Sequence, residues 1–213
     1  MPDTSDADLP RFSAAALQEW GGNVESVIRG IPHALNNRAA ALSAVIELSR
    51  DPTGDDAEAV SSILSSELVR VSELAQVVRT IGTPRHGVEA FAPRDAATES
   101  LAVLQLQIEH RDRMVTIEAA AAPPVRAHRW MFVRALISLG SAASNDTTGA
   151  AARILIVEDS DWIVTRVEEI RAPTAEVSPY AAELARAMGG ETLGTSCGFR
   201  LPSLTTLRRR EAR

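Results

Sequence analysis

Cysteine and aromatic residues are scarce in this sequence, and each scarcity excludes a kind of protein. The single cysteine, Cys197, excludes an internal disulfide, which is the expectation for a reducing compartment. Aromatic residues make up only 4% of the chain, and the 3 tryptophans are scattered, so we expect no stacking platform for nucleic acid. The core should therefore be built mainly from aliphatic side chains.

Long apolar runs and an excess of positive charge are missing as well. No stretch approaches the roughly 20 apolar residues that span a bilayer, and the N-terminus lacks the pattern of a signal peptide. The chain has 22 Lys and Arg against 28 Asp and Glu, and the net charge of -6 disfavours nucleic acid and anionic membranes. We therefore expect a cytoplasmic protein with no nucleic-acid partner and no membrane partner.

Motifs for metals and nucleotides are also lacking. Cys197 has no neighbouring thiol, and His86, His110 and His128 are too far apart in sequence for a zinc motif. Neither a P-loop nor a Gly-x-Gly-x-x-Gly stretch occurs. The sequence therefore predicts no metal site and no bound cofactor.

The N-terminal part, residues 11–86, predicts an antiparallel helical hairpin. Apolar residues recur at spacings of three and four on both sides of the breaker "RDPTGDD". They are Val24, Ile28, Ile31, Leu35, Ala39, Leu42 and Ile46, then Val60, Leu64, Leu68, Val71, Leu74 or Ala75, Val78 and Ile81. Two helices alone cannot bury both stripes, so we expect a homodimer in which two hairpins form a four-helix bundle.

The C-terminal part, residues 87–205, predicts an α/β sandwich, which makes the whole chain α+β. Helical patterns at 96–111, 129–144 and 178–190 alternate with strand patterns at 114–120 and 198–204 and with a β-hairpin at 153–170 that turns at "EDSD". Strands with helices on one side form a two-layer domain. Residues 1–10 are expected to be disordered and residues 206–213 to form a basic tail.

One histidine, His33, lies in the first predicted helix within "GIPHALNNRAAAL". At 100° per residue it is about 160° from Leu35, so it should face away from the apolar stripe. Arg29, Asn37 and Ala40 lie within about 40° of it on the same face. The same side also carries Gly30, Asn36, Ala41 and Ala44.

A helix face of glycine, alanine and asparagine allows another protein to approach closely. Neutral imidazole is nucleophilic near pH 7 and can accept a phosphoryl group and pass it on. An exposed helix histidine is more often an ordinary surface residue, and that alternative stays open. Pro32 favours a special role, because a proline inside a helix costs about 3 kcal/mol.

The stretch "PHALNN" on a dimerising hairpin, followed by an α/β sandwich, resembles the two-component sensor histidine kinases. The similarity extends over residues 20–205 and implies that His33 is the phospho-acceptor. It places Asn37 where an amide or hydroxyl orients a water molecule or the partner's aspartyl phosphate. Ala34 stands where these kinases usually have an acidic residue, which argues against autokinase activity.

The second half resembles the ATP-binding domain of these kinases but departs from it at the nucleotide site. Ser138 and Ala142 replace asparagines that would hold Mg²⁺ and phosphate, and Glu169 and Arg171 replace an aspartate and a glycine that would contact adenine. The segment before Tyr180 is too short for the ATP lid and lacks its Gly-x-Gly loop. The resemblance thus implies a degenerate domain that does not bind ATP.

Together these features predict a histidine phosphotransferase that relays phosphate between receiver-domain aspartates through a phosphohistidine on His33. Asn36 and Asn37 would assist the reaction, and the partner-binding face would comprise Arg29, Gly30, Ala40, Ala41 and Ala44. The receivers of response regulators would supply Mg²⁺. The alternatives are a divergent active kinase, a non-catalytic adaptor, and a phosphatase in which Asn37 aligns water.

Overall fold

The computed structural model describes most of the chain, and every structural statement below refers to that part. The described residues are 10–49, 56–82, 87–107, 115–120, 122–146, 152–168, 178–194 and 197–211. Residues 1–9, for which disorder is expected, lie outside it, as do Glu169 and Arg171.

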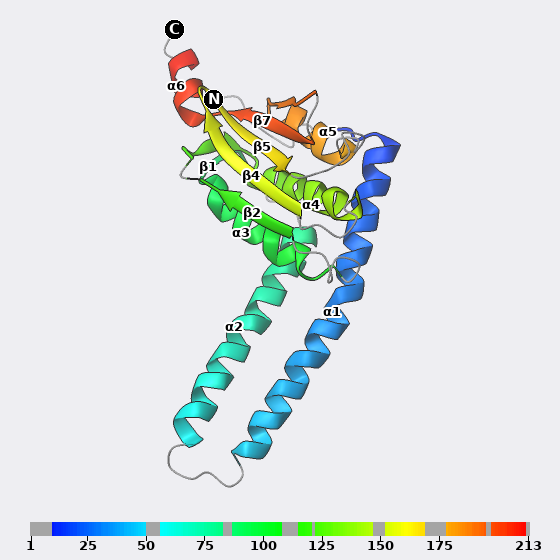
Figure 1. Ribbon diagram of the computed structural model, residues 1–213, viewed down its shortest axis with the longest axis vertical. Helices are drawn as coiled ribbons and strands as arrows, with labels where there is room; N and C mark the ends of the chain where they lie inside the picture. Colours follow the sequence, from blue (N-terminus) through cyan, green and yellow to red (C-terminus); the bar gives the residue numbers. More distant parts are fainter. Residues whose placement is uncertain are drawn as a thin grey trace.

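The N-terminal part is a hairpin of two long helices, α1 (Ala14–Leu48) and α2 (Asp56–Gly82). Ser13 begins α1 by accepting a hydrogen bond from the Ala16 N–H at 3.3 Å. Pro32 lies inside α1 without ending the helix. The lower halves of both helices extend well beyond the rest of the molecule (Figure 1).

The C-terminal part contains a five-stranded sheet with the strand order β2-β4-β5-β7-β6. β2 runs parallel to β4, and the other neighbouring pairs are antiparallel. The strands are β2 (Val115–Ala119), β4 (Ala152–Asp159), β5 (Trp162–Glu168), β6 (Glu191–Thr192) and β7 (Gly198–Pro202). The β4–β5 hairpin turns where the sequence predicted, with Ser160 at φ 58°.

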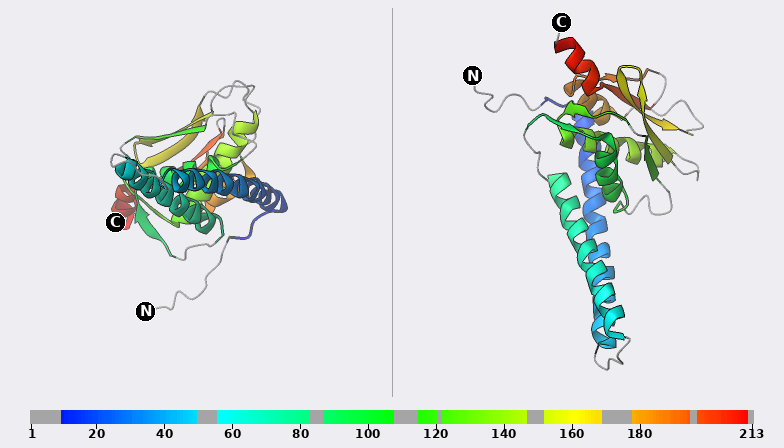
Figure 2. Two further views of the ribbon diagram at one scale, coloured as in Figure 1. Left: turned by 90° about the horizontal axis from the view of Figure 1, so that it is seen from below. Right: turned by 90° about the vertical axis from the view of Figure 1, so that its left-hand side faces the viewer.

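One face of the sheet is covered by α3 (Pro93–Leu104), α4 (Arg129–Asp146) and α5 (Pro179–Ala187). The alternation along β4 shows this, because Ala152, Ile154 and Ile156 are buried while the residues between them are half-exposed. These helices lie between the sheet and α1 (Figure 2). The predicted α+β class, a helical hairpin followed by an α/β sandwich, is confirmed.

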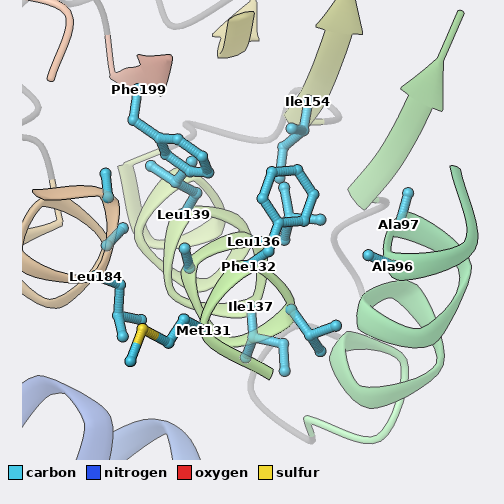
Figure 3. Packing of buried hydrophobic residues seen from close by; sticks show 14 of the residues in the cluster. Ala96, Ala97, Met131, Phe132, Leu136, Ile137, Leu139, Ile154, Leu184 and Phe199 are labelled. Carbon is cyan, nitrogen blue, oxygen red and sulfur yellow. The ribbon is translucent and has the colours of Figure 1, made fainter. Parts of the chain in front are cut away.

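The core of the α/β domain is organised around α4. Figure 3 shows α4 with α3 on one side, α5 on the other and the sheet above it. Phe132 is fully buried and meets Phe91 and Phe199 edge-on at centroid distances of 5.5 and 5.7 Å. Because neighbours surround it, α4 is buried along almost its whole length.

Two elements differ from the sequence prediction. Residues Val125–Ala127 form strand β3, which pairs with β1 (Glu89–Phe91) as a second small sheet, where a loop was expected around "AAPPV". The segment predicted as a basic tail contains helix α6 (Leu204–Glu211), which the sequence patterns did not indicate. The start of α6 is fixed by Thr206, whose hydroxyl donates to the Asp161 carboxylate at 2.8 Å.

None of the described helices has both the length and the apolar composition that a membrane crossing requires.

Candidate functional site

His33 is exposed on α1, as the helical spacing predicted. Asn36, Asn37, Ala40 and Ala44 are exposed on the same helix, while Ala41 is half-buried. Arg29 is also exposed, and its guanidinium group lies 3.9 Å from the Glu25 carboxylate. A partner therefore has direct access to an imidazole surrounded by small and amide side chains. The roles of these residues stay predictions.

Gly30 corrects the predicted partner face, because this residue is covered by the chain itself. It is buried, and a Cβ added to it would lie 1.8 Å from the carbonyl oxygen of Leu106. Leu106 follows α3, so Gly30 lets the α/β domain contact α1 one turn before His33. The prediction that Gly30 contacts a partner is wrong in this arrangement.

Replacing Gly30 by alanine should loosen this contact. We expect Gly30→Ala to lower the free energy of unfolding by about 1–3 kcal/mol, because backbone atoms must shift to admit the methyl group. Gly21→Ala on the same helix is the matched control, since nothing lies within 4 Å of its added Cβ. The control should gain about 0.5–1 kcal/mol from helix propensity. Urea denaturation of both variants measures the difference, and equal midpoints would contradict the expected contact.

Each helix of the hairpin carries a stripe of exposed apolar side chains, and we call the two stripes together the apolar face. Its members are exposed large side chains of α1 and α2, namely Ile28, Leu35, Ile46, Leu64, Leu68, Val71 and Val78. On each helix these positions lie roughly 90–100° from the residues that face the other helix. In an antiparallel pair the two stripes therefore fall on the same side of the hairpin.

The apolar face and His33 lie on different sides of α1. Their directions differ by roughly 150° around the helix axis. A second chain packed on the apolar face would therefore leave His33 accessible.

A buried ion-pair network lies between the two helices of the hairpin. The Glu67 side chain is 3% exposed. Its carboxylate lies 3.4 Å from Arg38 and 2.6 Å from Arg70. Both arginines, together with Ala34 and Leu106, line a cleft of about 290 Å³ beside the helical turn that carries His33. Glu73 also lines this cleft, so its lining carries charges of both signs.

The upper part of α1 packs against the α/β domain at what we call the domain junction. The junction is formed by Glu19, Trp20, Asn23 and Gly30 of α1 with Leu106, Arg134, Ser138, Ser178 and Tyr180. Glu19 caps α5, because its carboxylate accepts from the Ser178 hydroxyl and from the Tyr180 N–H at 2.9 Å. A negative charge at a helix N-terminus is stabilised by the helix dipole.

Aromatic rings complete the domain junction. Trp20 stacks on Tyr180 with a centroid distance of 5.1 Å, and the Arg134 guanidinium lies 4.8 Å from the Trp20 ring. Arg134 also donates to the carbonyl oxygen of Ile81 at 2.7 Å, so the α/β domain holds α2 as well as α1.

Burial raises the pKa of Glu19 above 4.5, although the hydrogen bonds from Ser178 and Tyr180 oppose the shift. The folded chain therefore holds this proton more tightly than the unfolded chain, so this contribution to stability is greatest below pH 4.5 and is lost as pH rises through the raised pKa. We expect the free energy of unfolding of the wild type, relative to that of Glu19→Gln, to decrease as pH rises from 4.5 through the raised pKa of Glu19. Thermal or urea unfolding across acidic pH measures it, and a flat difference would contradict the raised pKa.

Two residues that the resemblance would place at an ATP site, Ser138 and Ala142, lie on α4. The Ser138 hydroxyl is buried and accepts a hydrogen bond from Asn23 of α1 at 3.1 Å. Ala142 is half-buried on the same helix. Within the described residues, no cluster of three or more His, Cys, Asp or Glu side chains could hold a metal ion.

The sequence did not reveal the residues of the domain junction. Glu19 and Ser178 are separated by 159 positions. The available signals were local, namely "SPY" as the start of a helix and a tryptophan before the apolar stripe.

No protein-family profile matches the chain, and no characterised protein sequence matches it either. Three solved structures illustrate what the chain is similar to. The histidine kinase AdeS of Acinetobacter baumannii is 12% identical, with 81% of this chain and 98% of that chain covered and a TM-score of 0.43. A histidine kinase from Burkholderia phymatum STM815 is 12% identical over 90% and 98% of the two chains, with a TM-score of 0.39. A bacterial phosphotransferase is 14% identical over 90% and 98%, with a TM-score of 0.36.

Proposed function

We propose that this protein is a histidine phosphotransferase of a two-component phosphorelay, which receives phosphate from one receiver domain and gives it to another. The observation that carries the proposal is the exposed His33, placed on a long helix among small and amide side chains. Such a surface admits a second protein closely enough for group transfer.

The proposed reaction forms one bond and breaks one. A nitrogen of the neutral His33 imidazole attacks the phosphorus of a receiver's aspartyl phosphate, and the bond from phosphorus to the carboxylate oxygen breaks. The aspartate leaves as a free carboxylate, and His33 carries the phosphoryl group. A second receiver's aspartate reverses these steps. Mg²⁺ held by the receiver would neutralise charge on the phosphoryl oxygens.

The neighbours of His33 would position the partner. Asn36 and Asn37 can donate amide hydrogen bonds to phosphoryl or carboxylate oxygens, and Arg29 adds a cation on the same face. Positioning supplies much of the rate enhancement in phosphoryl transfer.

We further propose that the protein needs no ATP. A triphosphate commonly binds where backbone N–H groups and a helix N-terminus face the anion. At the N-terminus of α5 the Tyr180 N–H already donates to the Glu19 carboxylate, and the Ser138 hydroxyl accepts a hydrogen bond from Asn23. This internal pairing supports a domain that serves as structure and partner surface.

The proposed partner for the apolar face is a second copy of the chain. A two-fold axis lets the same stripe pair with itself and gives a four-helix bundle. Because His33 points away from that face, both phospho-acceptors of the dimer stay open to receivers.

The test is to mix the purified protein with receiver domains that carry radiolabelled phosphate from acetyl phosphate. Label that moves to the protein in an acid-labile, alkali-stable form supports relay through histidine. Release of all label as inorganic phosphate would instead support a phosphatase. Labelling by ATP and Mg²⁺ alone would support an active kinase, and no change in any label would support an adaptor.

A further inference from the structure

The domain junction places the α/β domain against the same helix that carries His33. Its contacts extend from Glu19 to Gly30, over three turns of α1. They are of different kinds: a capped helix N-terminus, an aromatic stack, a hydrogen bond between Asn23 and Ser138, and the approach of Leu106 to Gly30.

These contacts leave little freedom for the domain to rotate. A rotation about the α1 axis would separate Trp20 from Tyr180, and a shift along the axis would move Leu106 away from Gly30. Arg134 adds a second attachment, because it holds the last turn of α2 through the Ile81 carbonyl. A domain attached to both helices of a hairpin cannot swing about either one alone.

We infer that the domain junction is a permanent lock, which holds the α/β domain in one orientation relative to His33 without any ligand. Glu19 is its central positioning residue, because its carboxylate serves as the internal anion for the N-terminus of α5. The significance of the lock for relay rests on the proposed function, since a fixed domain presents the same surface to each receiver that docks at His33. The lock itself can be tested without phosphotransfer.

The experiment measures the distance between the α/β domain and the hairpin in the full-length chain. Spin labels are placed at Arg186→Cys on α5 and Ser43→Cys on α1, both exposed positions, with Cys197→Ser to remove the native thiol. Labelled protein is diluted into an excess of unlabelled protein so that distances within one chain dominate. Electron–electron double resonance then reports the distribution of distances.

A locked junction predicts a single narrow distribution that Mg²⁺ and ATP leave unchanged. Glu19→Ala combined with Trp20→Ala should broaden the distribution at least twofold, because both the cap of α5 and the ring stack are lost. Glu25→Ala, at an exposed glutamate of the same helix, is the control and should leave it narrow. If the double variant does not fold by circular dichroism, Glu19→Gln alone is used, and a measurable broadening is still expected.

A broad distribution in the protein with an intact junction would overturn the inference. So would a narrow distribution that persists after both junction side chains are removed, or a shift on addition of ATP. The outcome is separate from the phosphotransfer assay, because a narrow distribution together with no labelling of His33 would refute the proposed function and leave the lock standing.

Discussion

Replacing His33 by alanine is expected to abolish the transfer of label from a phosphorylated receiver, with a fall in rate of at least about a thousandfold. The reason is chemical, since no other side chain on this face of α1 is a nucleophile that can hold a phosphoryl group. His33 is exposed, so its loss should leave the unfolding midpoint close to that of the wild type. Rapid-quench labelling with a phosphorylated receiver measures the rate.

Gln18→Ala is the matched control for this prediction, because Gln18 is exposed on the same helix about four turns before His33. It should transfer label at the wild-type rate. Asn37→Ala should slow transfer by about tenfold, the value of one hydrogen bond that forms only during transfer. Full labelling of His33→Ala would show that phosphate is carried elsewhere and would refute the proposed function.

Replacing Leu68 by glutamate is expected to separate the proposed dimer into monomers. Leu68 is 66% exposed in the single chain and lies in the middle of the apolar face. Burying a leucine contributes about 1.5–3 kcal/mol, and a two-fold interface contains each residue twice. The dissociation constant should therefore rise by roughly a hundredfold to ten thousandfold. Sedimentation velocity over a range of protein concentrations measures it.

The control for the dimer is Ser62→Glu, which adds the same charge to α2 on the side away from the apolar face. It should sediment as the wild type does. A wild-type protein that remains monomeric at micromolar concentrations would refute the dimer proposal, as would a Leu68→Glu variant that remains dimeric.

The hairpin could be predicted from the sequence because its signal is local. Apolar residues at helical spacing and the break at Pro52 and Gly54 were enough to place α1 and α2 within a few residues. The same spacing could not say what each side of a helix contacts. The stripe through Ile28 and Leu35 is exposed in the single chain, and the contact between the helices instead includes the buried ion pairs of Glu67.

In the α/β domain, the strong β-branched strands were predicted and the weak ones were not. β4 and β5 are rich in isoleucine and valine, and their turn was placed correctly. Strand β3 has only three residues, follows two prolines and gains its hydrogen bonds from β1, more than thirty positions earlier in the chain. Because β3 is so short and its partner is distant in sequence, its residues show no alternating pattern that would predict a strand.

The candidate site was only partly accessible to sequence reasoning, for a similar reason. The exposure of His33 follows from angles within one helix, so it could be predicted. The burial of Gly30 and the capping of α5 by Glu19 depend on how the second domain rests on the first. Such contacts join residues that only the folded chain brings together.

Pro32 leaves the carbonyl oxygen of Ile28 without the N–H that an ordinary residue would donate, and this missing bond is next to His33. The helix nevertheless continues through Pro32, since α1 runs from Ala14 to Leu48. With the α/β domain held against the upper part of α1, alignment of the reacting atoms falls to the side-chain rotamer of His33 and to the docked protein.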